Sequence, residues 1–140
     1  MATYVGFQKA TEVMMEAGNA ASDVFKLALT NAAPTIGTDT TIVSELSGTN
    51  GYTTGGVTCA TASSAQTAGV YKLTLTVPSP TWTSATGSMG PFRYVILYNS
   101  TQSQCVAYWD YGVGGVTLNG VNADTFTVTV AAEVLSITTP

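Results

Sequence analysis

The feature of this chain that most constrains its fold is an alternation of apolar and polar residues with a period of two. Residues 24–30 (VFKLALT), 71–77 (YKLTLTV) and 125–130 (TFTVTV) all follow it, and threonine fills the polar positions of the last segment. Successive side chains of a β-strand point to opposite faces, and the β-branched threonine suits the outer face of a strand. The alternation therefore predicts strands with one buried and one polar face.

The most apolar part of the chain consists of two neighbouring segments, residues 92–98 (FRYVILY) and 105–111 (CVAYWDY). A turn-forming Asn-Ser-Thr-Gln-Ser stretch separates them, so we expect an antiparallel hairpin at the centre of a sheet. Weaker strand patterns occur in residues 41–46, 56–62 and 134–138. Together these segments make about eight short strands with Gly- and Ser-rich turns. Such a pattern predicts an all-β fold, either a two-sheet sandwich or a small barrel, and we expect an antiparallel β-sandwich.

One segment, residues 4–18, is predicted to be helical. Its apolar side chains recur at steps of three and four residues, which is typical of an amphipathic helix. These positions are Phe7, Ala10, Met14 and Ala17. We expect this helix or arm within residues 1–21, followed by the β-sandwich over residues 22–140. Because 140 residues is the usual size of one domain, residues 1–140 are expected to form a single domain.

Charged residues are few in this chain. They make up 9% of it, against about a quarter in a typical soluble protein, and the polar surface comes from Thr, Ser and Asn instead. The four Lys and Arg residues do not cluster and the net charge is -4, so we expect no nucleic-acid binding. The sequence starts without a basic and then apolar leader, and no apolar run approaches the roughly eighteen residues of a membrane helix. We therefore expect synthesis in a cytoplasm and no membrane association.

The sequence offers little for catalysis. It contains no histidine, which excludes the Ser-His-Asp and Cys-His mechanisms and removes the commonest metal ligand. Asp110 lies between aromatic residues and is either a catalytic acid or ligand, or an acceptor for amides of the turn at residues 112–115; we prefer the second interpretation. Cys59 and Cys105 lack the spacing of a zinc site. They could pair as a disulfide, but in a reducing cytosol we prefer the alternative that both are small buried apolar residues. No catalytic residue, metal or cofactor is expected.

Two stretches without a regular pattern, residues 35–55 and 78–90, are expected to be exposed loops that offer contact surfaces. Trp82 lies in the second of them and is the candidate for an exposed aromatic contact, for instance with a sugar ring. The alternative for such an aromatic residue is packing in the core.

Four ordered blocks of the sequence carry a resemblance to a known family. They are residues 24–31 (VFKLALTN), 63–73 (SSAQTAGVYKL), 90–99 (GPFRYVILYN) and 109–112 (WDYG). Together they resemble small virion structural proteins of tailed bacteriophages, over most of the chain. The resemblance implies a non-enzymatic capsid decoration, or cement, protein. Such a protein is assembled in the host cytoplasm and binds the outer surface of the shell formed by the phage major capsid protein, commonly as a homotrimer.

The predicted helix is the first candidate for the contact element, through Phe7, Val13 and Met14. A helix that only caps the open end of the sandwich is the alternative. Two other functions remain open at this stage: a tail, neck or head-fibre subunit, and a carbohydrate-binding module that aids host adsorption. The fold alone does not separate them.

Overall fold

The structure is a computed structural model, and it describes residues 3–7, 22–38, 41–68, 70–76, 81–129 and 133–138. Every strand pairing in this part of the chain is antiparallel, which confirms the prediction of a predominantly β protein with antiparallel sheets. The elements are β1 (Thr3–Gly6), β2 (Phe25–Thr30), β3 (Val57–Thr67), β4 (Val70–Thr76), β5 (Thr81–Thr83), β6 (Met89–Phe92), β7 (Tyr94–Asn99), β8 (Gln104–Asp110), β9 (Val116–Leu118), the short 3-10 helix η1 (Gly120–Asn122), β10 (Thr125–Thr127) and β11 (Glu133–Thr138).

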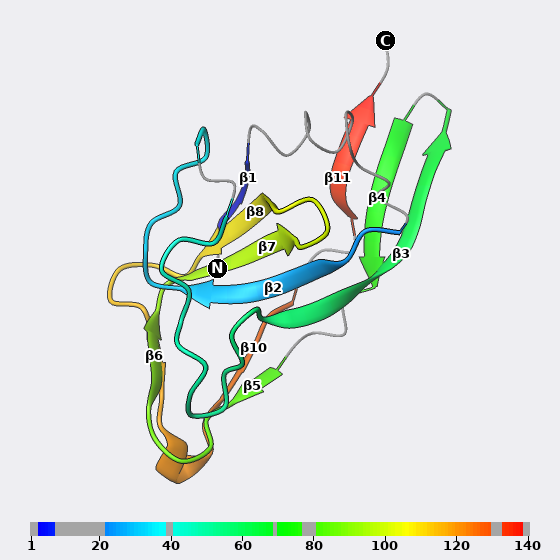
Figure 1. Ribbon diagram of the computed structural model, residues 1–140. Helices are drawn as coiled ribbons and strands as arrows, with labels where there is room; N and C mark the ends of the chain where they lie inside the picture. The colour runs from blue at the N-terminus through cyan, green and yellow to red at the C-terminus, as the bar shows by residue number, and fades with distance from the viewer. Residues whose placement is uncertain are drawn as a thin grey trace.

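The strands form one large sheet and two small ribbons. The large sheet has seven strands in the order β1-β8-β7-β2-β3-β4-β11, and the ribbons are β10-β5 and β6-β9. In Figure 1 the ribbons lie below the large sheet, and β3, β4 and β11 extend away from its centre. Strands from the two ends of the chain, β1 and β11, therefore form the opposite edges of the same sheet.

The centre of the sheet is the hairpin predicted from the two most apolar segments. Strands β7 and β8 pair from Tyr94↔Asp110 to Asn99↔Gln104, and β2 pairs along the other side of β7. Most residues of these three strands are buried on both faces of the sheet. Because β7 and β8 are buried on both faces, their sequences are nearly continuous apolar runs instead of a strict alternation.

Aromatic residues mark two parts of the core. Tyr108 makes edge-to-face contacts with Phe7 and with Tyr94, at ring-centroid distances of 5.8 Å. Phe126, in the β10-β5 ribbon, has a second set of aromatic neighbours: Trp82, Phe92 and Tyr111. Such offset and edge-to-face pairs add about 0.5–1.5 kcal/mol each beyond the burial of their area. The second cluster therefore joins the ribbon to the end of β6, through Phe92, and to Tyr111 directly after β8.

The strand predicted for residues 41–46 is wrong. This segment belongs to a long loop between β2 and β3, and its strand-type pairing with the sheet is limited to the single bridge Thr30↔Glu45. The hydroxyl of Thr30 donates to the carbonyl oxygens of Val43 and Ser44, at 2.8 and 2.9 Å. Ser44 has a φ of 49°, which breaks a strand. A side-chain bond to the loop thus replaces the backbone ladder that the alternation suggested.

The prediction of an N-terminal helix is wrong for its first residues. Residues Tyr4 to Gly6 belong to strand β1, which pairs with Trp109, Tyr108 and Ala107 of β8. The exposed backbone groups at the edge of β8 favour a strand there, because tertiary pairing overrides a weak local pattern. Residues 8–21, which carry the rest of the predicted helix, lie outside the described residues.

The predicted loop at residues 78–90 is also partly wrong, because it contains β5 and the start of β6. Three- and four-residue strands are too short for their alternation to stand out in a sequence.

Candidate protein-binding surfaces

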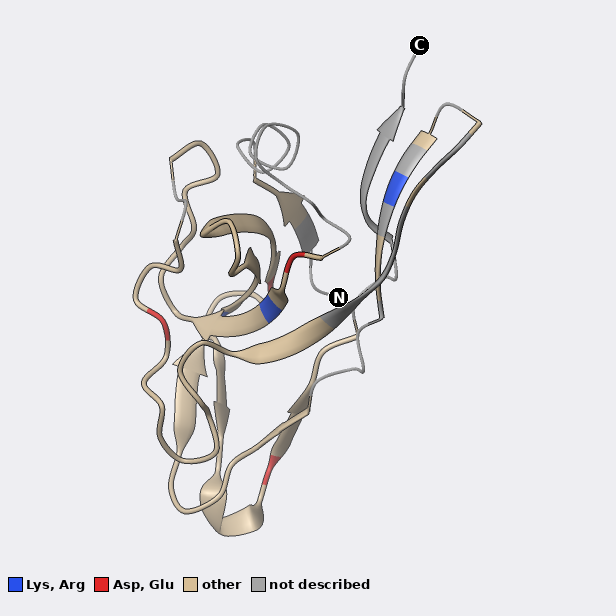
Figure 2. Cartoon of the chain, turned by 45° about the vertical axis from the view of Figure 1, so that its right-hand side comes forward, with Lys and Arg blue, Asp and Glu red and all other residues tan. Residues whose placement is uncertain are grey.

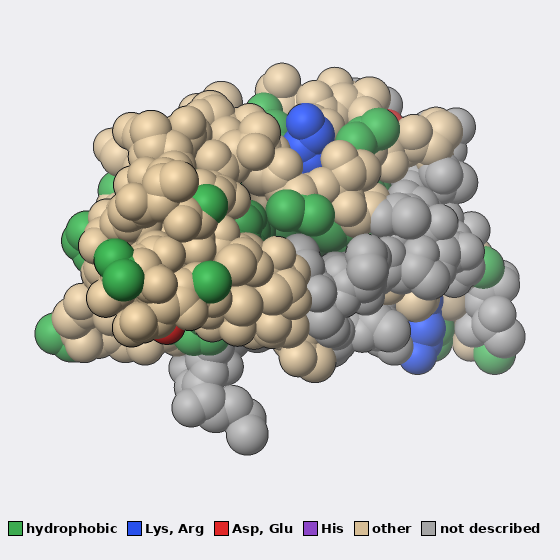
Figure 3. All heavy atoms as spheres, turned by 90° about the horizontal axis from the view of Figure 1, so that it is seen from below, with side chains coloured by type: hydrophobic (Ala, Val, Ile, Leu, Met, Phe, Trp, Pro, Cys, Tyr) green, Lys and Arg blue, Asp and Glu red, His purple; other side chains and the backbone are tan. Residues whose placement is uncertain are grey.

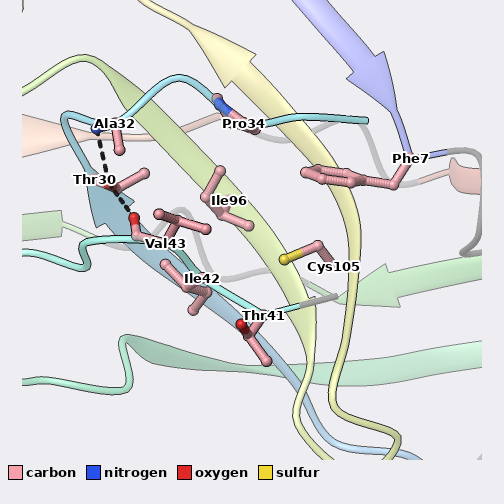
Figure 4. A pocket seen from close by; sticks show the side chains of 9 residues that line it. All are labelled: Phe7, Thr30, Ala32, Pro34, Thr41, Ile42, Val43, Ile96 and Cys105. Carbon is pink, nitrogen blue, oxygen red and sulfur yellow. Dashed lines mark hydrogen bonds between the residues drawn. The ribbon is translucent and has the colours of Figure 1, made fainter. Parts of the chain in front are cut away.

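Phe7, the first residue predicted at an interface, is buried. It follows β1, its amide donates to the carbonyl of Val106 at 2.8 Å, and its side chain is 4% exposed. Figure 4 shows the ring pointing into a slot that also contains Ile42 and Cys105. The slot has a volume of about 10 Å³, room for about one water molecule, so it is a packing seam. In this structure Phe7 is a core residue and offers no exposed contact. Val13 and Met14 lie outside the described residues, and their role stays a prediction.

The prediction that Trp82 is exposed is wrong. Its side chain is 3% exposed, and its ring stacks on Phe126 at a centroid distance of 6.1 Å and an interplanar angle of 27°. The two residues lie opposite each other in the β5-β10 ribbon, with Thr81 and Thr83 on the outer face. Trp82 is thus a core residue of a strand that was mistaken for a loop, and it provides no platform for a sugar.

Asp110 accepts a hydrogen bond from the turn that follows it, which is the interpretation preferred in the sequence analysis. The amide of Gly112 donates to its carboxylate at 2.8 Å, and the guanidinium of Arg93 donates twice, at 2.7 and 2.6 Å. The hydrogen bonds from Arg93, then the one from Gly112, lower the pKa of Asp110 to about 2. Arg93 also lies 4.9 Å from the centre of the Tyr94 ring. A carboxylate held this firmly in its charged form suits a structural role and not a general acid.

Sequence reasoning missed Arg93. The hairpin register places Tyr94 opposite Asp110, so its neighbour Arg93 lies beside the carboxylate. The sequence predicted that the two apolar segments pair, but it did not predict which residues lie opposite each other. Without that register the contact between Arg93 and Asp110 could not be predicted.

The loop between β2 and β3 is tied to the sheet through a small polar cluster. The hydroxyl of Tyr52 donates to Glu45 at 2.5 Å and accepts from the amide of Leu29 at 3.1 Å, and the amide of Gly55 donates to Glu45 at 2.6 Å. Burial, and next the hydrogen bond to Glu45, raise the pKa of Tyr52. A side chain at Gly56 would meet the carbonyl oxygen of Leu27 at 2.1 Å, so the loop returns to β3 in close backbone contact. These contacts hold the loop as a fixed surface beside β2.

Cys59 and Cys105 do not form a disulfide with each other. They lie on β3 and β8, and strands β7 and β2 separate those strands in the sheet. Both residues are buried, at 2% and 1% exposure, which agrees with the expectation of small core residues. Burial raises the pKa of the Cys59 thiol to about 11.

The exposed surface of the described body is weakly charged and only sparsely apolar. Figure 2 shows the charged residues scattered singly along the chain. The large apolar side chains that are exposed are four valines at positions 24, 43, 113 and 121. Seen from below, apolar side chains form small separate groups among polar and backbone atoms (Figure 3). Isolated apolar residues of this kind are normal for a protein surface and do not mark a binding patch.

Residues 60–67 of β3, together with β4 and β11, form a three-stranded arm whose two edge strands have no strand partner on their outer sides among the described residues. Strand β3 pairs with β2 through residues 57–59, and from residue 60 on its one partner among the described strands is β4. Strand β11 pairs with β4, and no described strand pairs with its other side. Figure 1 shows this arm extending from the body, with the C-terminus at its end. Both edges of the arm therefore present unpaired backbone donors and acceptors within the described chain.

The two edges lack the features that commonly block strand pairing. Residues 60–67 contain no charged residue and no proline, and in β11 the one charged residue is Glu133 at its start. Proteins often protect edge strands with lysines, prolines or a covering element. The arm is therefore the best candidate for a protein-binding surface.

Comparisons of the chain with protein-family models, with curated proteins and with solved structures find no match. Within the described residues, no helix has the length and apolar character needed to cross a membrane. In the same part of the chain, no three His, Cys, Asp or Glu residues gather into a group that could hold a metal ion.

Proposed function

We propose that this protein is a non-enzymatic structural component of a tailed-bacteriophage particle, and that it acts as a capsid decoration protein. It would bind the outer surface of the shell built by the major capsid protein and stabilise it, as a homo-oligomer in which a trimer is favoured. The sequence resemblance suggests this role, and the three-stranded arm is the observation that supports it best.

The arm supports the proposal because its chemistry is that of a protein-binding element. An open strand edge binds another extended chain through main-chain hydrogen bonds, and this mode of recognition needs no charged side chains. The few charges on the rest of the described chain agree with a surface made for lasting contact, since charged residues are depleted at the centre of stable interfaces. Many copies on one shell would add up weak contacts into strong attachment.

We also propose that the body is a β-sandwich. The seven-stranded sheet would form one layer, and the two ribbons would form the smaller second layer. Support comes from the core, which includes residues of the large sheet, such as Leu97, together with Trp82 and Met89 of the ribbons.

Cryo-electron microscopy of intact particles that contain the protein tests the location. Density on the outer shell at three-fold or quasi-three-fold positions is the expected result. Density confined to the tail, neck or head fibre would contradict decoration and establish the second function that the sequence left open.

A binding assay complements the microscopy. Purified protein is mixed with particles that lack it and is expected to sediment with them until the sites are saturated, while particles that already carry it take up none. Sedimentation with neither kind of particle would contradict binding to the shell. The carbohydrate-binding alternative has lost its leading residue, because Trp82 is buried.

A further inference from the structure

The arm has two different faces, which its register defines. Residues directly opposite each other in antiparallel strands lie on the same face of a sheet. Tyr71 and Leu73 of β4 lie opposite Ile137 and Leu135 of β11. On the other side of β4 the same two residues lie opposite Gln66 and Ser64 of β3, so this face is apolar along β4 and β11 and polar along β3. It continues into the body at Leu75, which is 2% exposed and belongs to the core.

The other face of the arm is polar. Lys72 of β4 lies opposite Ser136 of β11 and Ala65 of β3, and both Lys72 and Ala65 are exposed. The two faces therefore differ mainly along β4 and β11, where the first is apolar and the second carries Lys72 and Ser136.

We propose that three copies of this chain pair through their arms, with β11 of one copy lying beside residues 60–67 of β3 in the next copy. The inference deepens the proposed function by naming the interface between its copies, and it rests on that function only in assuming a homo-oligomer. Because the two edges are different surfaces, the contact is head-to-tail, and the rotation between neighbouring copies closes it into a ring of three.

The directions of the strands allow this ring. Strands β3 and β11 both run antiparallel to β4, so they run in the same direction. A rotation axis along the strands preserves that direction, and β11 of one copy then meets β3 of the next as a parallel pair. A closed ring of arms is a β-barrel, which leaves no edge unpaired.

The size of such a barrel favours three copies. A barrel of about eight strands has an interior that side chains just fill, and three arms of three strands each come closest to it. Closure would turn the face of Tyr71, Leu73 and Leu135 inward, and the face of Lys72 and Ala65 outward. One arrangement therefore pairs both edges and encloses the apolar residues of β4 and β11, with Ser64 and Gln66 of β3 on the same inner face.

Cysteine cross-linking of the purified full chain tests the interface. Ala65 of β3 and Ser136 of β11 both lie opposite Lys72 of β4, so that β4 separates them within one chain. Two strand spacings amount to about 10 Å, too far for a disulfide within one copy, which requires Cα atoms within about 7 Å. A variant with both Ala65→Cys and Ser136→Cys is expected to give covalent trimers on oxidation. Two further double-cysteine variants, one at Ala65 and Thr138 and one at Thr67 and Ser136, test pairings of the two strands that are shifted by two residues.

The single variants are the matched controls. In the head-to-tail ring, Ser136→Cys alone forms no cross-link, whereas a two-fold pairing of β11 with β11 would give a covalent dimer. The native Cys59 and Cys105 are buried and common to every variant. Sedimentation of the wild-type protein is expected to give about three times the 14.4 kDa of one chain.

Three results would overturn the inference: a monomer in solution, a dimer cross-linked through Ser136→Cys alone, or a trimer that none of the three cysteine pairs cross-links. Circular dichroism identifies any cysteine variant that does not fold. The double-cysteine variants that do fold then test the interface. A trimer that does not sediment with particles would refute decoration but leave the arm interface intact, so the two failures are distinguishable.

Discussion

At the scale of single residues, the clearest interactions are the ones that fix turns and strand ends. Asp110 receives hydrogen bonds from Arg93 and from Gly112, and so joins the start of β7, the end of β8 and the following turn. Asp23 accepts from the side chain of Asn99 at 2.8 Å, and Asn99 accepts from the amides of Thr101 and Gln102 in the central hairpin turn. Short polar side chains thus satisfy the backbone where strands end.

The Arg93–Asp110 pair predicts a dependence of stability on pH. The pKa of Asp110 is lowered from 3.8 to about 2 in the folded protein, so its contribution is complete above about pH 4 and is lost as the pH falls towards 2. We expect Asp110→Asn to be less stable than wild type in urea at pH 7, and this difference to shrink at pH 2. The effect is modest because both side chains are partly exposed. A difference that stays constant over this range would show that the carboxylate charge does not contribute.

At the scale of elements, the ribbons and the arm depend on very different contacts. The β5-β10 ribbon has three residues in each strand and is held by its aromatic cluster. The arm has longer strands and more pairing, but no partner among the described residues along its two edges. The ribbon is therefore stabilised by packing, and the arm by backbone hydrogen bonds that another chain can extend.

The burial of Trp82 predicts a large loss on its removal. We expect Trp82→Ala to reduce the free energy of unfolding by about 3–5 kcal/mol, the usual cost of deleting a buried aromatic side chain. The matched control is Val113→Ala, because Val113 is 94% exposed, and its change should stay within about 0.5 kcal/mol. Urea unfolding monitored by circular dichroism measures both. Equal stability of the two variants would contradict the position of Trp82 in the core.

At the scale of the whole molecule, the seven-stranded sheet joins parts of the chain that are far apart in sequence. Its central strands β2, β7 and β8 come from residues 25–30 and 94–110, and its edges come from the two ends of the chain. The two cysteines lie on strands three places apart in this sheet, and both are buried. Their accessibility therefore reports on the opening of the sheet as a whole.

The thiols are predicted to be unreactive in the folded protein. Because burial raises the pKa of Cys59 to about 11, little thiolate forms at pH 8. Titration with a thiol reagent at pH 8 is expected to detect almost no reaction in the native state and both thiols in denaturant. Rapid reaction of either thiol under native conditions would show that the sheet opens locally near it.

Sequence reasoning reached the elements whose signal is local. The period-two alternation identified β2 and β4, and the pair of apolar segments identified the central hairpin, because a pleated strand imposes that period on any half-buried segment. It also placed Asp110 at a turn, because turn chemistry depends on neighbouring residues. The absence of histidine limited the chemistry of the chain without any structure.

Only the tertiary structure decided the remaining features. Trp82 lies in a three-residue strand, and its burial depends on Phe126, more than forty residues later in the chain. The strand at Tyr4 to Gly6 exists because the edge of β8 is available to it, and the bidentate contact of Arg93 requires the hairpin register. The two open edges of the arm likewise cannot be predicted from the sequence, since a local pattern identifies a strand but not which strands lie beside it. The sequence by itself determined which segments prefer to be strands; their partners, and the edges left without one, depend on contacts between distant residues that local patterns do not encode.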